Sequence, residues 1–317
     1  MDTSKQASLV NYARYGQKLD KPAMLGTIGR SRIEFIDSFK SDVFDKVCSL
    51  AASAPEHVRP LIEYQLQGLE QSKGYRPAFF FACAQISSTA LDYQEIVTRA
   101  AVLHLFHESC LLFDDLFDQA RKRRGRRTAH LVFGRVPTIC TAVWAKEIGY
   151  SIYSEDPAIV QSLHQCTTDL IDAEAFQWVA RNALRPTKVS NWERIARGST
   201  GALFRLAAAL AGLQSDEDVI DALAICYHGI DDLHDLLGIA GLGGGGNDDL
   251  RDNIPTLATC FTAVQSREEL QRVVPECVDY LRGLLSLPLS ARQSEFRPFF
   301  EEMAALLSLV PLERIGA

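Results

Sequence analysis

The stretch from His107 to Thr128, HESCLLFDDLFDQARKRRGRRT, places three aspartates shortly before a dense basic cluster. With 3.6 residues per helical turn, Asp114 and Asp118 lie at positions i and i+4 of one helix face with Asp115 beside them, so their carboxylates can share cations. Like charges this close are costly unless cations separate them. The acidic triplet and the basic cluster together suit a site that holds a polyanion through bridging Mg2+ ions.

Two simpler explanations exist for this stretch. A DDxxD pattern occurs by chance on solvated helix faces, and RKRRGRR (121–127) alone is typical of a nuclear-localisation or nucleic-acid-binding segment. The preceding residues argue against both explanations, because Leu103, Phe106 and Cys110 recur at spacings of three and four. This series predicts a core helix that ends in the acidic cluster.

A second aspartate cluster of the same form lies in residues 227–236, YHGIDDLHDL. Asp231 and Asp235 again stand at i and i+4 with Asp232 beside them, and the apolar helical positions Ile220 and Leu223 precede them. Two such motifs, each closing an apolar helix, are hard to explain as two solvated faces. They favour one site in which metal ions join two helices.

With these two motifs the chain resembles the trans-isoprenyl diphosphate synthases, the polyprenyl synthetase family, over about residues 73–257. The resemblance implies an all-α fold of the isoprenoid synthase class I type, a single-domain bundle of antiparallel helices around a deep central cavity. It implies homodimers. It also implies three Mg2+ ions that hold an allylic diphosphate on the two motifs, whose six aspartates are Asp114, Asp115, Asp118, Asp231, Asp232 and Asp235.

The resemblance assigns a set of basic residues to isopentenyl diphosphate, the homoallylic co-substrate. In the family a GGKRxRP loop precedes the first aspartate motif by one helix, and Lys73 and Arg76 match it in QSKGYRP. A histidine seven residues before the first aspartate and the second arginine of an RRG triplet complete the set, here His107 and Arg124. Without the resemblance, KGYRP is more often an exposed turn, and a lone histidine on an apolar helix is more often a core residue.

The residues implied for the allylic diphosphate are retained only in part. Arg123 matches the first arginine of RRG, Thr200 matches the threonine of a lysine-threonine pair, and His228 stands where the family has glutamine. Charged family residues are replaced at four positions, which are Ala180, Ser199, Gly245 and Ile254. Arg194 and Arg197, a turn from the missing lysine, are candidates to supply the lost positive charge.

The implied reaction is ionisation of the allylic C–O bond, attack by the double bond of isopentenyl diphosphate, and loss of a proton. Metal ions on the aspartates act as Lewis acids, and an apolar wall that includes Phe113 protects the carbocation. In the family the residues four and five places before the first aspartate limit product length, and here Cys110 and Ser109 are both small. Phe106, one turn deeper, is then the first large obstacle. One turn of 5.4 Å is about one isoprene unit, which predicts a product of about C20.

Three functions stay open at this point. The preferred one is a Mg2+-dependent prenyltransferase that makes a longer all-trans prenyl diphosphate, similar to geranylgeranyl diphosphate synthases. A class I terpene synthase on the same scaffold would ionise and cyclise a prenyl diphosphate without isopentenyl diphosphate, and the missing allylic lysines favour it. A non-catalytic subunit that pairs with an active synthase is less favoured, because it would have little reason to keep both motifs.

The helices that must position these motifs are expected to form one domain. Residues 1–30 are weakly patterned and predict a peripheral arm, whereas 31–317 contain no linker and form the isoprenoid synthase domain. The apolar period predicts helices over 31–52 and 58–69, and GGGG at 243–246 predicts a flexible flap. The net charge of −7 argues against nucleic acid as a partner. Eight cysteines without a CxxC pair, no signal-peptide core and no long apolar stretch predict a cytoplasmic protein without a transmembrane segment.

Overall fold

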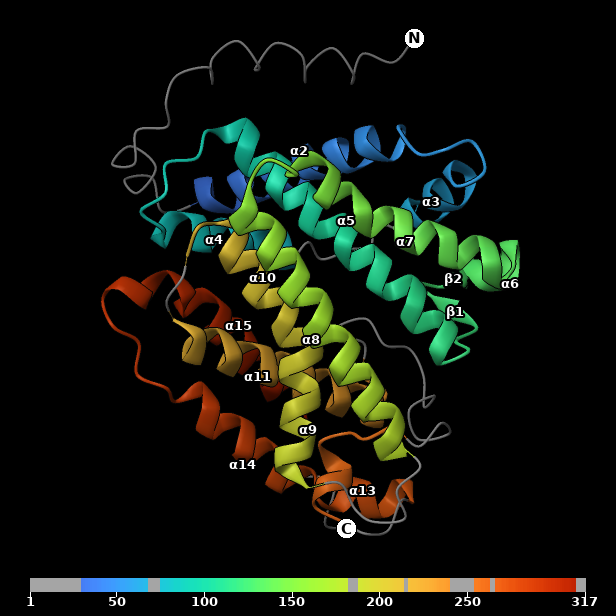
Figure 1. Ribbon diagram of the computed structural model, residues 1–317. Coiled ribbons are helices and arrows are strands. Elements are labelled where there is room, and N and C mark those ends of the chain that lie inside the picture. The colour runs from blue at the N-terminus through green and yellow to red at the C-terminus, as the bar shows by residue number, and fades with distance from the viewer. Residues whose placement is uncertain are drawn as a thin grey trace.

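The computed structural model describes residues 30–67, 75–181, 188–213, 216–239, 254–262 and 266–311. Most of the expected arm, Lys73 and the glycine run at 243–246 lie outside these ranges. Within them the chain is an assembly of α-helices with one short β-hairpin (Figure 1). This confirms the all-α prediction.

The helices and strands, in chain order, are α2 (Arg30–Ala51), α3 (Arg59–Leu66), α4 (Tyr75–Ile86), α5 (Tyr93–Phe117), β1 (Lys122–Arg123), β2 (Arg126–Arg127), α6 (Ala129–Phe133), α7 (Arg135–Ile152), α8 (Pro157–Arg181), α9 (Val189–Ala196), α10 (Ala202–Leu210), α11 (Glu217–Leu237), α13 (Arg267–Arg272), α14 (Val274–Leu285) and α15 (Arg297–Ser308). A π-helical turn, Arg197–Gly201, joins α9 to α10, and 3-10 turns occupy Ala258–Cys260 and Arg292–Phe296. The helices predicted over 31–52 and 58–69 are confirmed as α2 and α3, apart from their end residues.

Helix α5 lies within the bundle and delivers the first aspartate motif. Its start is fixed by Asp92, whose side chain accepts a hydrogen bond from the backbone N–H of Glu95 at 2.8 Å, which satisfies a donor of the first turn. The helix packs against α2, α4 and α7 (Figure 1). It is long and apolar enough to cross a membrane, yet 72% of its most apolar window is buried in the protein. The first motif therefore emerges at the C-terminal end of a buried helix, as predicted.

The basic cluster after this helix folds as a β-hairpin, which the sequence did not predict. Lys122 pairs with Arg127 and Arg123 pairs with Arg126 in antiparallel register. Arg124 and Gly125 form the turn with φ angles of +50° and +74°, and a type I′ hairpin turn requires positive φ at both of its central residues. Glycine adopts this conformation freely, whereas a residue with a side chain holds it at a cost of about 1–2 kcal/mol. At Arg124 a buried ion pair, described below, offsets that cost.

Helix α11 delivers the second motif. It packs against α10, α14, α15 and the π-helical turn, and its buried residues include the predicted apolar positions Ile220 and Leu223. Residues of α5 and of α11 belong to one continuous apolar cluster. A single core therefore positions both aspartate motifs, and the C-terminal helices α13 to α15 complete it.

Candidate active site

Arg123 binds two of the three aspartates of the first motif. Its Nη2 donates to Oδ2 of Asp114 and its Nε donates to Oδ1 of Asp115, both at 2.7 Å. Burial of Asp115 raises its pKa to about 6, although the guanidinium of Arg123 opposes this rise. Arg123, the residue expected to bind the allylic diphosphate, thus serves as a counterion of these two aspartates.

Arg181, the last residue of α8, binds the third aspartate. Its Nη2 donates to Oδ1 of Asp118, and its side chain is only 7% exposed. Its guanidinium carbon lies 5.5 Å from the ring centre of Trp178 on the same helix. Sequence reasoning missed this residue, because a cation in the last turn of a helix is ordinarily explained by the helix dipole alone.

Glu174 is a further carboxyl group near the first motif that the sequence did not single out. Burial, together with the negative charges of Asp114 and Asp118, raises the pKa of Glu174 to about 7. This carboxyl group is therefore near half-protonation at neutral pH and can gain or release a proton beside the aspartates. The sequence could not predict this role, because a glutamate on an amphipathic helix is ordinarily a solvent-exposed residue.

Glu108 is the centre of a buried polar cluster on α5. Its fully buried carboxylate accepts hydrogen bonds from Arg124 Nη2 at 2.7 Å and from Gln65 Nε2 at 2.8 Å, and His104 Nε2 lies 3.4 Å away. Burial favours the neutral acid, yet His104 and Arg124 hold the pKa of Glu108 well below its usual value. Arg124, expected at the homoallylic diphosphate, is therefore engaged with an acid that the sequence analysis did not consider.

His107 and Arg76 lie close to one another beside the core. Burial and the positive charge of Arg76 hold the pKa of His107 well below its usual value, so its ring is neutral at pH 7. Arg76 lies in the first turn of α4 and not in an exposed turn, and its Nε is buried without a hydrogen-bond partner. Such a donor costs about 1–3 kcal/mol, which a phosphate oxygen would recover. The structure thus brings together two predicted homoallylic residues, whereas Lys73 lies outside the described residues.

His228 links the second motif to the π-helical turn. Its Nδ1 lies 3.0 Å from Oγ1 of Thr200, and its Nε2 lies 4.0 Å from Oδ1 of Asp232. Burial lowers the pKa of His228, whereas the negative charges of Asp231 and Asp114 raise it. The hydrogen bond with Thr200 therefore joins the second motif to the π-helical turn.

Asp232 is held by structural donors. Its Oδ2 accepts hydrogen bonds from Trp192 Nε1 at 2.9 Å and from the backbone N–H of Leu257 at 2.8 Å. Burial raises the pKa of Asp232 to about 8, so this carboxyl group is largely protonated at neutral pH. These contacts tie α11 to α9 and to the segment that follows the glycine run through Oδ2 alone. The metal roles of Asp231, Asp232 and Asp235 stay predictions.

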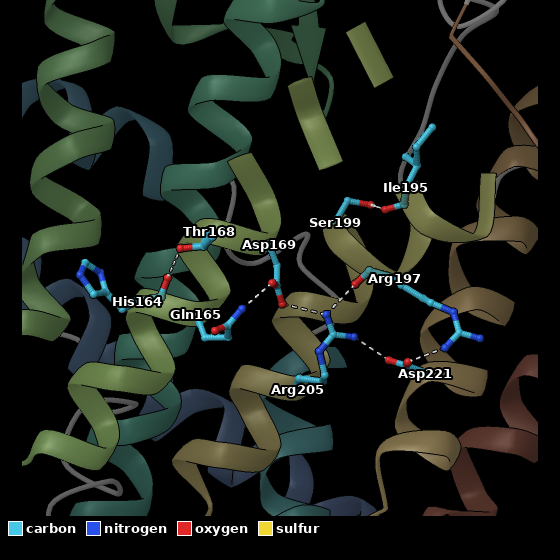
Figure 2. Close-up of polar contacts among 9 residues, drawn as sticks. All are labelled: His164, Gln165, Thr168, Asp169, Ile195, Arg197, Ser199, Arg205 and Asp221. Carbon is cyan, nitrogen blue, oxygen red and sulfur yellow. Dashed lines mark hydrogen bonds and ion pairs between the residues drawn. The ribbon is translucent and has the colours of Figure 1, made fainter. Parts of the chain in front are cut away.

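Arg205 secures the π-helical turn that carries Thr200. Figure 2 shows its guanidinium between Asp169 of α8 and Asp221 of α11, with hydrogen bonds of 3.0 and 2.6 Å. Its Nη2 also donates to the backbone carbonyl of Arg197 at 3.0 Å. Since π-helical turns are rare and frequently occur at functional sites, we interpret this network as the support that positions Thr200.

Within the described residues 188–201, no arginine is found in a position to replace the family lysine that is missing at Ser199. Ser199 donates to the backbone carbonyl of Ile195 at 2.7 Å (Figure 2). Arg194 bonds to Asp172, and Arg197 belongs to the network of Figure 2. Both arginines line a hollow of about 320 Å³ that contains none of the predicted site residues. The hypothesis that one of them replaces the lysine is therefore not supported.

The residues predicted to set product length lie on α5. Phe106 and Ser109 are fully buried, and Lys146 of α7 lies 5.8 Å from the ring centre of Phe106. Cys110 packs against the same core cluster as Phe106. Phe113 packs against a separate small cluster formed with α3, α6 and α7, and its role in the apolar wall stays a prediction. The role of Phe106 as the cavity floor stays a prediction.

The donor set of the first motif fits Mg2+. Its side chains offer carboxylate oxygens, the hard ligands that this ion prefers, and Oδ2 of Asp115 is buried without a hydrogen-bond donor. No three acidic, histidine or cysteine side chains of the described ranges lie close enough to hold an ion by themselves. Mg2+ keeps several waters and is usually bound by one or two carboxylates together with substrate phosphates.

Comparisons with known proteins agree with this geometry. A model of the polyprenyl synthetase family matches residues 55–280. The geranylgeranyl pyrophosphate synthase of Penicillium janthinellum is 32% identical over 142 residues, which cover 43% of this chain and only 39% of that protein. The chain thus spans about two fifths of this curated relative's length.

Solved structures show the same fold. A decaprenyl diphosphate synthase from Rhodobacter capsulatus superposes with a TM-score of 0.66 at 21% identity, covering 89% of this chain and 98% of that one. A polyprenyl synthase from Caulobacter crescentus, complexed with calcium and isoprenyl diphosphate, superposes with a TM-score of 0.62 at 20% identity, covering 89% and 85%. The class I isoprenoid synthase fold expected from the sequence is therefore confirmed.

Proposed function

Because the chain belongs to the polyprenyl synthetase family, we propose that it is a Mg2+-dependent prenyltransferase. It would join an allylic diphosphate to isopentenyl diphosphate and release a longer all-trans prenyl diphosphate of about C20. The observation that carries this proposal is that both aspartate motifs close helices of one continuous apolar core, in a chain whose residues 55–280 match the family model.

The allylic diphosphate is assigned to the space between the two motifs. Asp114, Asp118 and Asp231 would hold Mg2+, which supplies Lewis-acid stabilisation of the leaving diphosphate when bound. Arg123 would turn from the aspartates to the diphosphate, because a guanidinium fork matches two phosphate oxygens. Thr200, oriented by its hydrogen bond with His228, would donate its hydroxyl to the same group.

The isopentenyl diphosphate is assigned to Arg76 and His107. The buried Nε of Arg76 needs an acceptor, and a neutral His107 can donate a hydrogen bond to a phosphate without adding charge. The buried apolar face of α5 around Phe106 would exclude water from the carbocation. The double bond of isopentenyl diphosphate then attacks the cation, and the proton lost afterwards goes to the departing diphosphate.

A terpene cyclase on the same scaffold is the second candidate. The observation in its favour is Ser199, whose hydroxyl bonds to a backbone carbonyl and brings no cation to the allylic side. Arg76 and His107 argue against it, because a cyclase takes no isopentenyl diphosphate and has no use for an arginine whose buried Nε lacks an acceptor. We therefore favour the prenyltransferase.

We also propose that two copies of the chain associate through α6, α7 and α8. Large apolar side chains are exposed on these helices, namely Leu131, Val132, Val136, Ile139, Val143, Ile171, Trp178 and Val179. Those of α7 recur at spacings of three and four, which places them on one face, and an apolar face of this kind marks an interaction surface. The cysteines are all unpaired thiols, in agreement with a reducing cytoplasm.

Incubation with farnesyl diphosphate, isopentenyl diphosphate and Mg2+, followed by product chromatography, tests the proposal. A longer prenyl diphosphate, absent when EDTA is added, is the expected result. A hydrocarbon or alcohol formed equally well without isopentenyl diphosphate would identify a cyclase. Sedimentation of the parent protein and of Val136→Glu, expected to be a dimer and a monomer respectively, tests the association.

A further inference from the structure

The allylic side of the site is short of positive charge if the proposed function holds, and the inference below rests on that function. A leaving diphosphate carries several negative charges. Yet Arg123 is the one cation that the family motifs match to it, Ser199 supplies none, and Arg194 and Arg197 pair with Asp172 and Asp221. The question is which other cation of the described residues can reach the same group.

We propose that Arg181 is a diphosphate-binding residue that contacts the leaving diphosphate beside Asp118. Arg181 ends α8, and its side chain crosses to α5 to bond with Asp118, 63 residues earlier in the chain. It thereby brings a second guanidinium to the first motif, at the opposite aspartate of the triplet from Arg123.

Two features point to a ligand and not to a purely structural ion pair. The side chain is more than nine-tenths buried, yet its Nε has no hydrogen-bond partner. A buried guanidinium donor without an acceptor is costly, and a bound phosphate oxygen would satisfy it. In addition, the nearby ring of Trp178 restricts the guanidinium, and a pre-oriented fork loses less freedom when it binds an anion.

The position of Arg181 should weaken the binding of a metal ion alone and strengthen the binding of a metal-bound diphosphate. Its guanidinium occupies Asp118, so it competes with any metal ion for that carboxylate. Once a diphosphate is present, the same guanidinium gains an anionic partner. Removal of the arginine should therefore strengthen the binding of the metal ion alone and weaken the binding of the metal-diphosphate complex. Loss of structure would weaken both.

The test compares the full-length parent with Arg181→Ala, Arg181→Lys and the control Arg194→Ala. The control removes a surface arginine that pairs with Asp172. Titration calorimetry measures binding of Mn2+ alone and of inorganic pyrophosphate in saturating Mg2+, and thermal unfolding checks the fold of each variant. Arg181→Ala should weaken pyrophosphate binding about tenfold or more, the value of one charged hydrogen bond, while Mn2+ binding is equal or tighter. Arg181→Lys should lie between, because lysine keeps the charge and loses the fork.

The outcomes separate this inference from the proposed function. Equal pyrophosphate affinity in Arg181→Ala and Arg194→Ala would overturn the role of Arg181 alone. A parallel loss of Mn2+ and pyrophosphate binding would also overturn it and would indicate a structural ion pair. A parent protein that binds no pyrophosphate in Mg2+ would overturn the proposed function as well.

Discussion

Replacement of Glu108 by glutamine should destabilise the protein and loosen Arg124 at the same time. The glutamine keeps the volume of the side chain but removes the negative charge that faces Arg124 and His104. Loss of one partner of a buried ion pair costs about 3–5 kcal/mol. Because 16% of the Arg124 side chain is exposed and can reach water, we expect the lower end, about 3 kcal/mol. In a chain of 317 residues that is a decrease in Tm of about 4–5 °C.

Glu108→Gln should also weaken the apparent affinity for isopentenyl diphosphate. Arg124 also holds a left-handed backbone conformation, so without Glu108 its side chain should lose its fixed position, and KM for isopentenyl diphosphate should rise more than KM for the allylic substrate. Calorimetry and steady-state kinetics at pH 7 measure both effects. At pH 7 Glu108 of the parent protein is fully ionised, because its pKa lies below the usual value. The stability that the ionised Glu108 contributes is lost only as the pH falls below about 4.

Glu269→Gln is the matched control. Glu269 pairs with Arg272 on the surface, with 35% and 63% of the two side chains exposed, and such pairs contribute about 1 kcal/mol or less. A decrease in Tm for Glu108→Gln no larger than that of the control would show that the cluster does not stabilise the fold. Equal changes in both KM values would refute the link between Glu108 and the homoallylic side.

Asp114→Ala should lower turnover about a thousandfold or more, because the variant loses metal-assisted stabilisation of the leaving group, and radiolabelled isopentenyl diphosphate incorporation measures it. Arg76→Ala should raise KM for isopentenyl diphosphate about tenfold more than KM for the allylic diphosphate, and equal effects in the same kinetics would contradict the assignment. Phe106→Ala should lengthen the product and Ser109→Phe should shorten it, whereas an unchanged chromatogram for both would exclude α5 as the cavity floor. Burial beside two aspartates raises the pKa of Glu174 to about 7, so the folded metal-free protein holds this proton more tightly than the unfolded chain does. The protein should therefore lose stability as the pH rises from about 5 to 8. Glu174→Gln should flatten the profile of Tm against pH over that range.

Much of the fold could be predicted because it depends on local patterns. The apolar period located α2 and α3, and the aspartate spacing placed each motif at the end of a buried helix. The common form of the motifs predicts that they converge on one site, since carboxylates that share cations must lie close together, and this convergence stays a prediction. The hairpin was missed because the arginine-rich segment has no alternation, and its turn depends on the backbone of Arg124 as well as on Gly125.

The counterions of the site could not be predicted in the same way. Glu108 and Arg181 find partners that are 16 and 63 residues away in the chain, and spacing along one helix gives no information on such pairs. Asp232 also has partners distant in sequence, because Trp192 and the backbone of Leu257 both donate to its Oδ2. Its predicted role as a metal ligand stays a prediction. Sequence patterns therefore identified which helices carry the two motifs, and packing determined which side chains pair with them.

Incorporation of radiolabelled isopentenyl diphosphate with dimethylallyl, geranyl, farnesyl or geranylgeranyl diphosphate as the acceptor tests the proposed activity most directly. Mg2+-dependent extension of one or more acceptors, with farnesyl diphosphate extended to a product of about C20 and no extension by Asp114→Ala or Asp231→Ala, is the predicted result. Failure of the folded parent protein to transfer label to any of the four acceptors would contradict the account.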